Sequence, residues 1–314
     1  MNRMAERIVV ALGGNALRRR EDRGTYAELE QRALAAMAPL CELFDPQRQV
    51  AITYGNGPVV GDNLIRHQAA RQAQPPMPLD WCGAESQGAL GYLLQRALAQ
   101  TLTRRGNRPR VATLLSMVEV DLSDEAFRHP TKPIGPFLTS AEARELEKSA
   151  SIAEDAGRGL RRVVASPAPK RVLETDAVVG LLDAGFVVMT LGGGGVPVAT
   201  NGNGFLVGVE AVIDKDLSSS LLAREIGATS LIILTDIDRV YLGYRSETRR
   251  PIARMTVDEA EEYLRGREFL TGSMAPKIEA AIAFLRGGGR RVLIGLPEAL
   301  PGMLVGKTGT EIVP

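Results

Sequence analysis

The sequence predicts an α/β fold in which helices cover both faces of an open, largely parallel sheet. Short apolar runs rich in β-branched residues alternate with longer helical patterns along the 314 residues. The short runs lack polar alternation, which is typical of strands buried on both faces of a parallel sheet. The chain is 45 % hydrophobic but only 4 % aromatic, so its core must be large and mainly aliphatic.

The expected strands follow one another with helices between them, which favours a sheet sandwiched by helices. The strands are residues 8–12, 49–54, 111–120, 186–191, 208–213, 230–236 and 291–296. The main helical patterns are residues 25–44, 84–103, 216–226 and 276–286. In the last helix Ile278, Ile282 and Leu285 fall on one face, and Gly287 follows as a stop signal.

Residues 121–171 interrupt this rhythm. The segment has no convincing long strand, several prolines and glycines, and one short helix at "TSAEARELEK", where Thr139 and Glu142 fit a capping box. About fifty residues are too many for an ordinary connection. We therefore expect a flap or small subdomain that protrudes from the sheet.

Composition and charge exclude several classes of protein. The formal net charge of +1 argues against a broad nucleic-acid or membrane surface, and no apolar run approaches the roughly 20 residues of a membrane span. Cys41 and Cys82 lack metal-ligand spacing, and no signal peptide is visible, so we expect a cytoplasmic protein with reduced thiols. The basic run at residues 18–20 is expected to be a solvated loop.

Three expected strands end in glycine clusters, "LGGNA", "YGNGP" and "LGGGGVP". One such cluster is more often a tight turn, but three at equivalent strand ends indicate an anionic ligand, because glycine lets backbone N–H groups approach it. Asn15 and Asn56 would add neutral side-chain donors. The candidate ligand-binding residues are Gly13, Gly14, Asn15, Gly55, Asn56, Gly57, Gly193 and Gly194.

Two familiar nucleotide motifs are excluded. Gly55 and Gly57 are followed by the next glycine at position 61, which misses the dinucleotide spacing. "GMLVGKTGT" near the end has only three residues between its first two glycines and no room for a following helix. Lys307 in this stretch is therefore expected to be structural.

Lysines and aspartates lie near the predicted anion site. Lys215 stands between Asp214 and Asp216 where a strand gives way to a helix, and Lys277 falls in the first turn of a helix, a locally unfavourable place for a cation. Lys132 lies among prolines in the protruding segment. Asp216 also suits an ordinary helix start, and Lys277 could be a surface lysine. Cations and carboxylates near glycine loops favour phosphoryl transfer assisted by Mg²⁺.

No Ser/His/Asp system is apparent, and His67 and His129 have no evident partner in the sequence.

Taken together, these motifs resemble the carbamate kinases of the amino acid kinase superfamily. The matching segments occur in order along almost the whole chain. They are "VVALGGNAL", "YGNGPVVG", "PLDWCGAESQGALGYLL", "PTKPIGPF", "RRVVASP", "GGGGVPV", "GVEAVIDKDLSSSLLA", "LTDIDRVY", "GSMAPKIEAAIAFL" and "GKTGT". Related acylphosphate kinases carry a lysine where this chain has Leu12, and the resemblance implies that Lys132 takes its place.

The resemblance implies a three-layer αβα sandwich of about eight strands. Residues 1–207 would form a lobe for carbamate or carbamoyl phosphate, with the subdomain at 121–171, and residues 208–314 a lobe for ATP or ADP with Mg²⁺. No separate metal site of the protein and no membrane or nucleic-acid partner are expected, and the family implies a homodimer.

The resemblance also implies roles for individual residues. The catalytic residues would be Lys132, Lys215, Asp216 and Lys277. The nucleotide would contact Asp214, Thr235, Asp236, Val240, Tyr241 and Met274, with the methionine over the base. A second interpretation places Val240 and Tyr241 in the core.

The sequence departs from the family pattern at a few positions. Tyr54 and Val59 stand where family members often have histidine and glutamine, and Glu85 stands where methionine is typical. None of these changes removes a proposed catalytic lysine or aspartate. Two alternatives therefore stay open, another acylphosphate-forming kinase of the superfamily or a catalytically weak regulatory paralogue.

Overall fold

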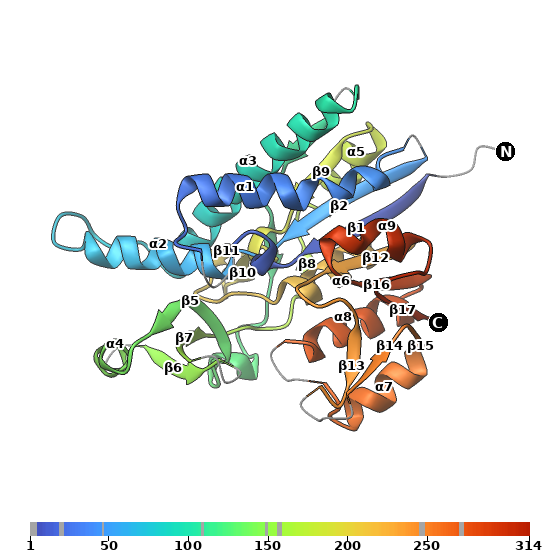
Figure 1. The fold of residues 1–314 in the computed structure, drawn as a ribbon. Helices are drawn as coiled ribbons and strands as arrows, with labels where there is room; N and C mark the ends of the chain where they lie inside the picture. The colour runs from blue at the N-terminus through green and yellow to red at the C-terminus, as the bar shows by residue number, and fades with distance from the viewer. Residues whose placement is uncertain are drawn as a thin grey trace.

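A computed structural model describes the chain at residues 5–18, 22–45, 47–107, 110–147, 150–155, 159–244, 249–269 and 273–314. At its centre lies an eight-stranded sheet in the order β15-β17-β16-β12-β1-β2-β9-β3 (Figure 1). All neighbouring strands in it are parallel except β16 and β17. The strands are β1 (Glu6–Leu12), β2 (Arg48–Tyr54), β3 (Val111–Thr113), β9 (Val187–Thr190), β12 (Ser230–Leu234), β15 (Arg254–Thr256), β16 (Arg291–Gly295) and β17 (Thr310–Val313).

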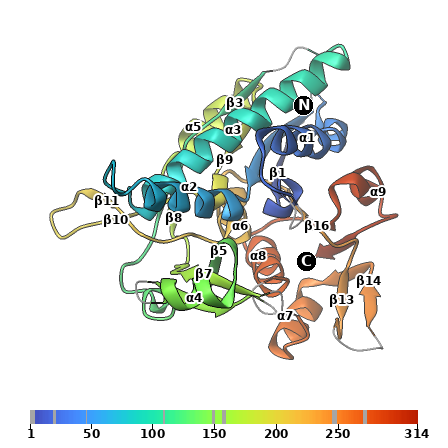
Figure 2. The same ribbon diagram turned by 60° about the vertical axis from the view of Figure 1, so that its left-hand side comes forward.

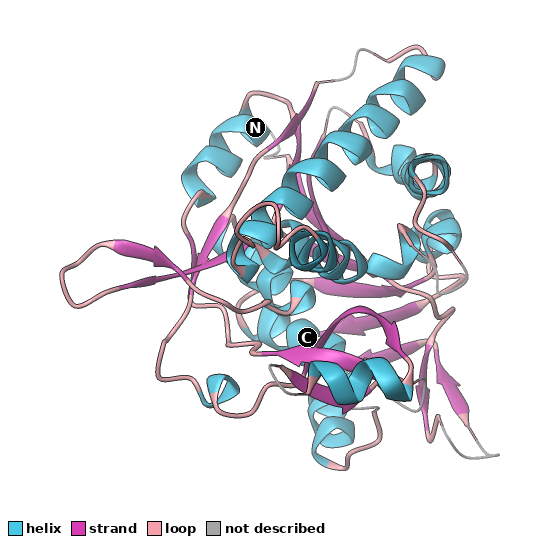
Figure 3. Cartoon of the chain, turned by 90° about the vertical axis from the view of Figure 1, so that its left-hand side faces the viewer, coloured by secondary structure: helices cyan, strands magenta, loops and turns pink. Residues whose placement is uncertain are grey.

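Helices cover both faces of this sheet, which confirms the three-layer prediction (Figure 3). One face carries α1 (Tyr26–Met37), α3 (Leu79–Arg104) and α9 (Leu300–Leu304), and the other carries α5 (Thr175–Asp183), α6 (Lys215–Glu225) and α8 (Ala275–Arg286). Successive side chains of β1 point to opposite faces of the sheet, so both faces need a cover of helices. Val10 packs with the first set of helices and Val9 with the second, and both are fully buried.

The large sheet runs continuously through residues 1–207 and 208–314, the two ranges predicted to form lobes. Strands β2, β9 and β3 lie on one side of β1, and strands β12, β16, β17 and β15 lie beyond it on the other. Strand β1 pairs with β12 along its length, from Ile8 opposite Ser230 to Leu12 opposite Leu234. Helix α7 (Val257–Arg265) and the hairpin of β13 (Val240–Leu242) and β14 (Arg250–Ile252) belong to the second half.

Two predicted strands are wrong in detail. Residues 111–120 form two short strands in different sheets, β3 and β4 (Met117–Glu119), because the chain leaves the large sheet after Thr113. Residues 208–213 contribute only Gly208 to a strand. Val209, Ala211, Val212 and Ile213 are buried, whereas Glu210 is exposed. The backbone N–H groups of Val209 and Val212 donate to Pro197 O and Ala165 O outside any strand ladder, so the apolar character of this segment reflects burial rather than sheet pairing.

Strand β4 belongs to a second sheet of four strands. Its order is β11-β10-β4-β8, with β8 (Arg171–Val172), β10 (Val196–Thr200) and β11 (Leu206–Gly208). The hairpin of β10 and β11 extends from the body of the molecule (Figure 2).

The predicted protruding subdomain is a small antiparallel sheet with one helix. Its strands are β5 (Lys132–Leu138), β7 (Leu160–Val164) and β6 (Ser151–Glu154), in that spatial order, and α4 (Ser140–Leu146) has the predicted Thr139–Glu142 capping box. The expectation of no long strand was wrong, because β5 has seven residues. Its prolines are tolerated because β5 is an edge strand with an irregular register after Ile134.

The subdomain packs against α2 (Gly57–Ala69), which follows β2. Ile134 of β5 is buried with Val60 and Leu64 of α2. The two backbones approach so closely that a Cβ on Gly61 would lie 1.9 Å from the Cα of Gly135. Glycine at position 61 thus permits β5 to lie over the start of α2.

Among the described residues, no helix combines the length and apolar character that crossing a membrane requires.

Candidate active site

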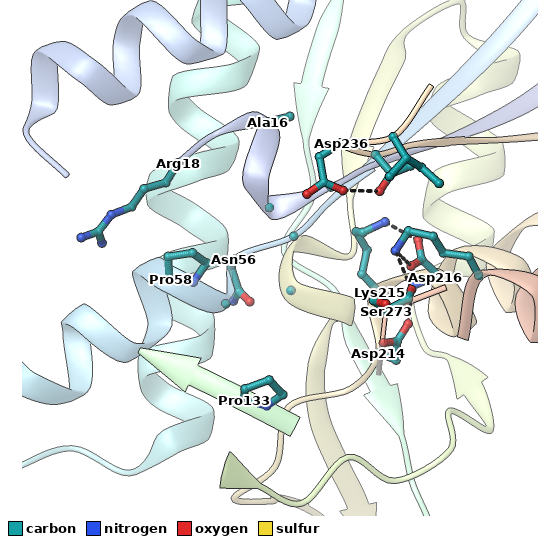
Figure 4. Close-up of a pocket in the computed structure, with 18 of the residues that line it drawn as sticks. Ala16, Arg18, Asn56, Pro58, Pro133, Asp214, Lys215, Asp216, Asp236 and Ser273 are labelled. Atoms are coloured by element: carbon teal, nitrogen blue, oxygen red, sulfur yellow. Dashed lines mark hydrogen bonds and ion pairs between the residues drawn. The ribbon is translucent and has the colours of Figure 1, made fainter. Parts of the chain in front are cut away.

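A cavity of about 980 Å³ lies beyond the carboxyl ends of β1, β2 and β12, with β5 of the subdomain on another side. In open α/β sheets this edge is where ligands bind. The cavity is lined by Gly13, Gly55, Lys132, Thr235 and Lys277, among others. Figure 4 shows three more of its lining residues, Asn56, Lys215 and Asp236. Residues from both halves of the sheet and from the subdomain therefore face one space.

The three glycine clusters meet at this cavity. The Gly13 N–H donates to Leu234 O and the Gly55 N–H donates to Leu12 O, both at 2.9 Å. A Cβ on Gly55 would lie 2.7 Å from the Gly14 nitrogen, so the first two loops can pack together only without a side chain there.

Most of the predicted ligand-binding residues line the cavity. They are Gly13, Gly14, Gly55, Asn56, Gly57 and Gly193. Gly194 does not line it and instead packs its Cα against Ile213. The side chain of Asn15 lies outside the described part of the chain.

The lysines and aspartates form one connected cluster. Asp214 is the N-cap of α6, where its Oδ1 accepts from the Asp216 N–H at 2.8 Å. Its Oδ2 accepts from Lys132 Nζ at 2.5 Å. Asp216 accepts from Lys215 Nζ through one oxygen and from Lys277 Nζ, at 3.0 Å, through the other. Lys132 from the subdomain and Lys277 from α8 are thus brought to the first turn of α6.

Burial and charge act against each other in this cluster. Burial lowers the pKa of Lys215, although Asp216 favours its charged form. For Asp216, burial alone would raise the pKa, but Lys215 and Lys277 hold it below its ordinary value. Lys277 keeps a raised pKa despite burial because Asp216 stabilises its charge. Three ammonium groups, including that of Lys132, face two carboxylates, and the excess positive charge suits an anion such as phosphate.

The predicted nucleotide residues line the same cavity, with one exception. Asp214, Thr235, Asp236, Tyr241 and Met274 all line it. Val240 does not. It is fully buried in the core, and its N–H donates to Thr310 Oγ1 at 2.9 Å. For this residue the structure favours the core interpretation.

Two arginines at the cavity were missed or misjudged from the sequence. Arg18 was expected in a solvated loop, but it lines the cavity and pairs with Asp62 of α2. Arg161 of β7 also lines the cavity, donating to Gly135 O at 2.9 and 2.6 Å and to Asp155 at 2.9 Å. The segment "RRVVASP", which contains Arg161, was the only signal available for it.

Residues considered structural lie away from this site. Lys307 does not line the cavity, and its N–H donates to Gly302 O at 2.8 Å in the terminal turn. The histidines do have acidic neighbours, contrary to the sequence interpretation. His67 Nε2 lies 3.2 Å from Glu85 Oε2, and His129 Nε2 lies 4.0 Å from Glu125 Oε2. No histidine is among the described residues that line the cavity.

Comparisons with known proteins agree on one family. Residues 6–295 match the model of the "Amino acid kinase family". A carbamate kinase of Pyrococcus horikoshii is 44 % identical over 99 % of this chain and 100 % of its own. A structure of carbamate kinase from Giardia lamblia bound to citric acid has a TM-score of 0.93, with 35 % identity over 98 % of both chains. The same enzyme bound to AMP-PNP has a TM-score of 0.89, again with 35 % identity and 98 % of both chains covered.

Proposed function

Because this chain belongs to the amino acid kinase family and, within it, to the carbamate kinases, we propose that its cavity catalyses reversible phosphoryl transfer between ATP and carbamate. In the forward direction a carbamate oxygen attacks the γ-phosphorus. A new O–P bond forms, the bond to the bridging oxygen of ADP breaks, and carbamoyl phosphate results. The observation that carries the proposal is the cluster in which Asp216 contacts Lys215 and Lys277 while Asp214 contacts Lys132.

Each side of the cavity takes one reactant. The glycine loops at Gly13, Gly55 and Gly193 bind carbamate, and the opposite side at Thr235 and Tyr241 binds the nucleotide. The lysines between them neutralise the phosphoryl group as charge develops on its oxygens. A Giardia lamblia relative of similar structure binds AMP-PNP, which supports a nucleotide in this cavity.

The reaction requires no general base, because carbamate is already an anionic nucleophile. The described lining of the cavity supplies lysines, arginines and backbone groups, which suit the stabilisation of negative charge. The protein therefore contributes mainly positioning and charge stabilisation.

Mg²⁺ would enter with the nucleotide. The carboxylates of Asp214 and Asp216 are already engaged by lysines, so they do not form a cage for a cation. Asp236, an exposed carboxylate that lines the nucleotide side, fits a metal held mainly by phosphate oxygens and water. When bound, Mg²⁺ supplies charge neutralisation on the nucleotide phosphates.

The test is ATP formation from ADP and carbamoyl phosphate, followed with luciferase. We expect turnover with Mg²⁺ and none with excess EDTA. Lys215→Ala should lower the rate about 10²–10³-fold, by analogy with loss of one transition-state donor, while Lys307→Ala, outside the cavity, keeps it. ADP binding without turnover would favour the regulatory paralogue, and turnover only with a larger acylphosphate would favour another kinase of the superfamily.

The oligomeric state and compartment belong to the same proposal. The family resemblance favours a homodimer in the cytoplasm. Exposed aromatic residues on α1 and α3, Tyr26, Trp81 and Tyr92, support an interface on that face. Light scattering coupled to size exclusion would give twice the monomer mass, and a monomer at micromolar concentration would contradict the dimer.

A further inference from the structure

The side-chain oxygen of Asn56 is a buried hydrogen-bond acceptor at the side of the cavity where carbamate is proposed to bind. The residue lies between β2 and α2 and is only 4 % exposed. Its Nδ2 donates to Ser86 Oγ at 2.5 Å, but no N–H or O–H group of the described residues donates to its Oδ1. A buried carbonyl oxygen without a donor is uncommon, because it loses its hydrogen bonds to water on burial.

The hydrogen bonds of Ser86 favour this orientation of the amide. The Ser86 hydroxyl donates its single proton to Gly83 O at 2.7 Å, so its oxygen accepts from the Asn56 amino group. With the amide turned over, Ser86 would have to donate to Asn56 instead, and its bond to Gly83 would be lost. The observed arrangement makes two hydrogen bonds where the reversed one makes one.

Packing also fixes where the amide lies. Gly193, with φ of +68°, brings its Cα against the side chain, and a Cβ there would lie 2.2 Å from the Asn56 amide atoms. Asn56 lines the cavity together with Gly193 and Gly57. Figure 4 shows its oxygen on the side that faces Lys215. The sequence suggested that Asn56 is a donor to an anion, whereas the structure makes it an acceptor.

We propose that Asn56 Oδ1 accepts a hydrogen bond from the amino group of carbamate and so selects carbamate over carboxylates that lack an N–H group. The inference rests on the proposed function and names what distinguishes its substrate. Carbamate and acetate differ only in an amino group in place of a methyl group. The methyl group would leave Oδ1 buried without a donor, and such unpaired groups are a strong basis for discrimination.

The experiment compares two phosphoryl donors, carbamoyl phosphate and acetyl phosphate, each with MgADP. For each we would measure kcat/KM for ATP formation. Wild-type protein should prefer carbamoyl phosphate by at least about tenfold, in line with one hydrogen bond to a buried acceptor. Asn56→Ala should reduce this preference by about 10- to 100-fold. The control Asn63→Ala changes the same residue type within α2, outside the cavity lining, and should keep the preference.

Ser86→Ala tests the orientation of the amide. Without the Ser86 hydroxyl the amide is free to turn over, so the preference for carbamoyl phosphate should fall by less than in Asn56→Ala. The KM for carbamoyl phosphate should change more than kcat does.

The outcomes separate the inference from the proposed function. No ATP from carbamoyl phosphate with wild-type protein would defeat the proposed function. ATP from both donors with equal kcat/KM would leave that function standing and overturn the role of Asn56, without any variant. Equal losses with both donors in a folded Asn56→Ala protein, checked by circular dichroism and ADP binding, would overturn it as well.

Discussion

Replacing Asp216 by asparagine removes the one carboxylate shared by two buried ammonium groups. Asp216 is 3 % exposed, and it contacts Nζ of both Lys215 and Lys277. Asparagine has nearly the same volume, so the change acts on charge rather than on packing. The variant therefore measures what the carboxylate contributes to stability and to catalysis.

The expected loss of stability is large. Removing one member of a buried ion pair typically costs about 3–5 kcal/mol, because the other charge is left uncompensated. Lys277 retains its contact with Ser273 O at 3.3 Å. Within the described chain, the side-chain hydrogen bond of Lys215 goes to Asp216, but burial already lowers the pKa of Lys215, and deprotonation limits the cost. We expect about 3–5 kcal/mol at pH 7.

The loss should shrink as the pH rises. In the variant the pKa of Lys215 falls further below its unfolded value of 10.5. Between the folded and unfolded pKa the unfolded chain binds more protons, so the free energy of unfolding increases with pH through that window. Rising stability is thus predicted from pH 7 towards alkaline pH, until other lysines begin to lose their protons.

Urea unfolding followed by circular dichroism at about pH 7 and about pH 9.5 gives both quantities. The control Asp236→Asn changes an exposed carboxylate of the same cavity and should stay within about 0.5 kcal/mol of wild type. A loss below about 1 kcal/mol for Asp216→Asn, or an equal loss at both pH values, would refute the reasoning. Retained ATP synthesis would refute the catalytic role.

Three further predictions concern the subdomain and the core. Lys132→Ala should raise the KM for carbamoyl phosphate at least about tenfold while calorimetry shows little change in ADP affinity; the opposite pattern would place Lys132 elsewhere. Gly61→Ala puts a Cβ 1.9 Å from the Gly135 Cα, so the subdomain should shift and kcat should fall with ADP binding kept, whereas unchanged kcat would mean that its seating is unimportant. Tyr54→Phe removes the 2.8 Å hydrogen bond to Gln87 O and should lower the free energy of unfolding in urea by about 1 kcal/mol without loss of activity. Loss of catalytic activity in this variant would indicate a catalytic role for Tyr54.

Local signals predicted the features that depend on local structure. The Asp214–Lys215–Asp216 stretch begins a helix because an aspartate caps it, and the sequence shows this directly. The continuous apolar runs of β1 and β12 predicted buried strands, because helices cover both faces of the sheet. The family resemblance added the predicted catalytic role of Lys132, which no local pattern supplies and which stays a prediction.

Features that depend on distant contacts could not be predicted in this way. Arg18 looks like part of a solvated basic run until Asp62 of α2 is placed beside it. The strand β5 contains prolines that argue against a strand, and only its edge position explains it. Val240 was equally compatible with the nucleotide site and the core, and the choice depended on Thr310, which is far along the chain.

In the proposed function, the pairing of β1 with β12 sets the distance between the carbamate loop and the nucleotide loop. The Gly13 loop and Thr235 follow adjacent strands, whose spacing in a sheet is about 4.8 Å. That spacing is a property of the hydrogen-bonded ladder, so it is mechanically stiff and changes only if the ladder breaks. Heating or denaturant should therefore leave the distance between the two substrates unchanged until the sheet melts. Activity lost below that temperature would report on the seating of the small sheet that carries Lys132.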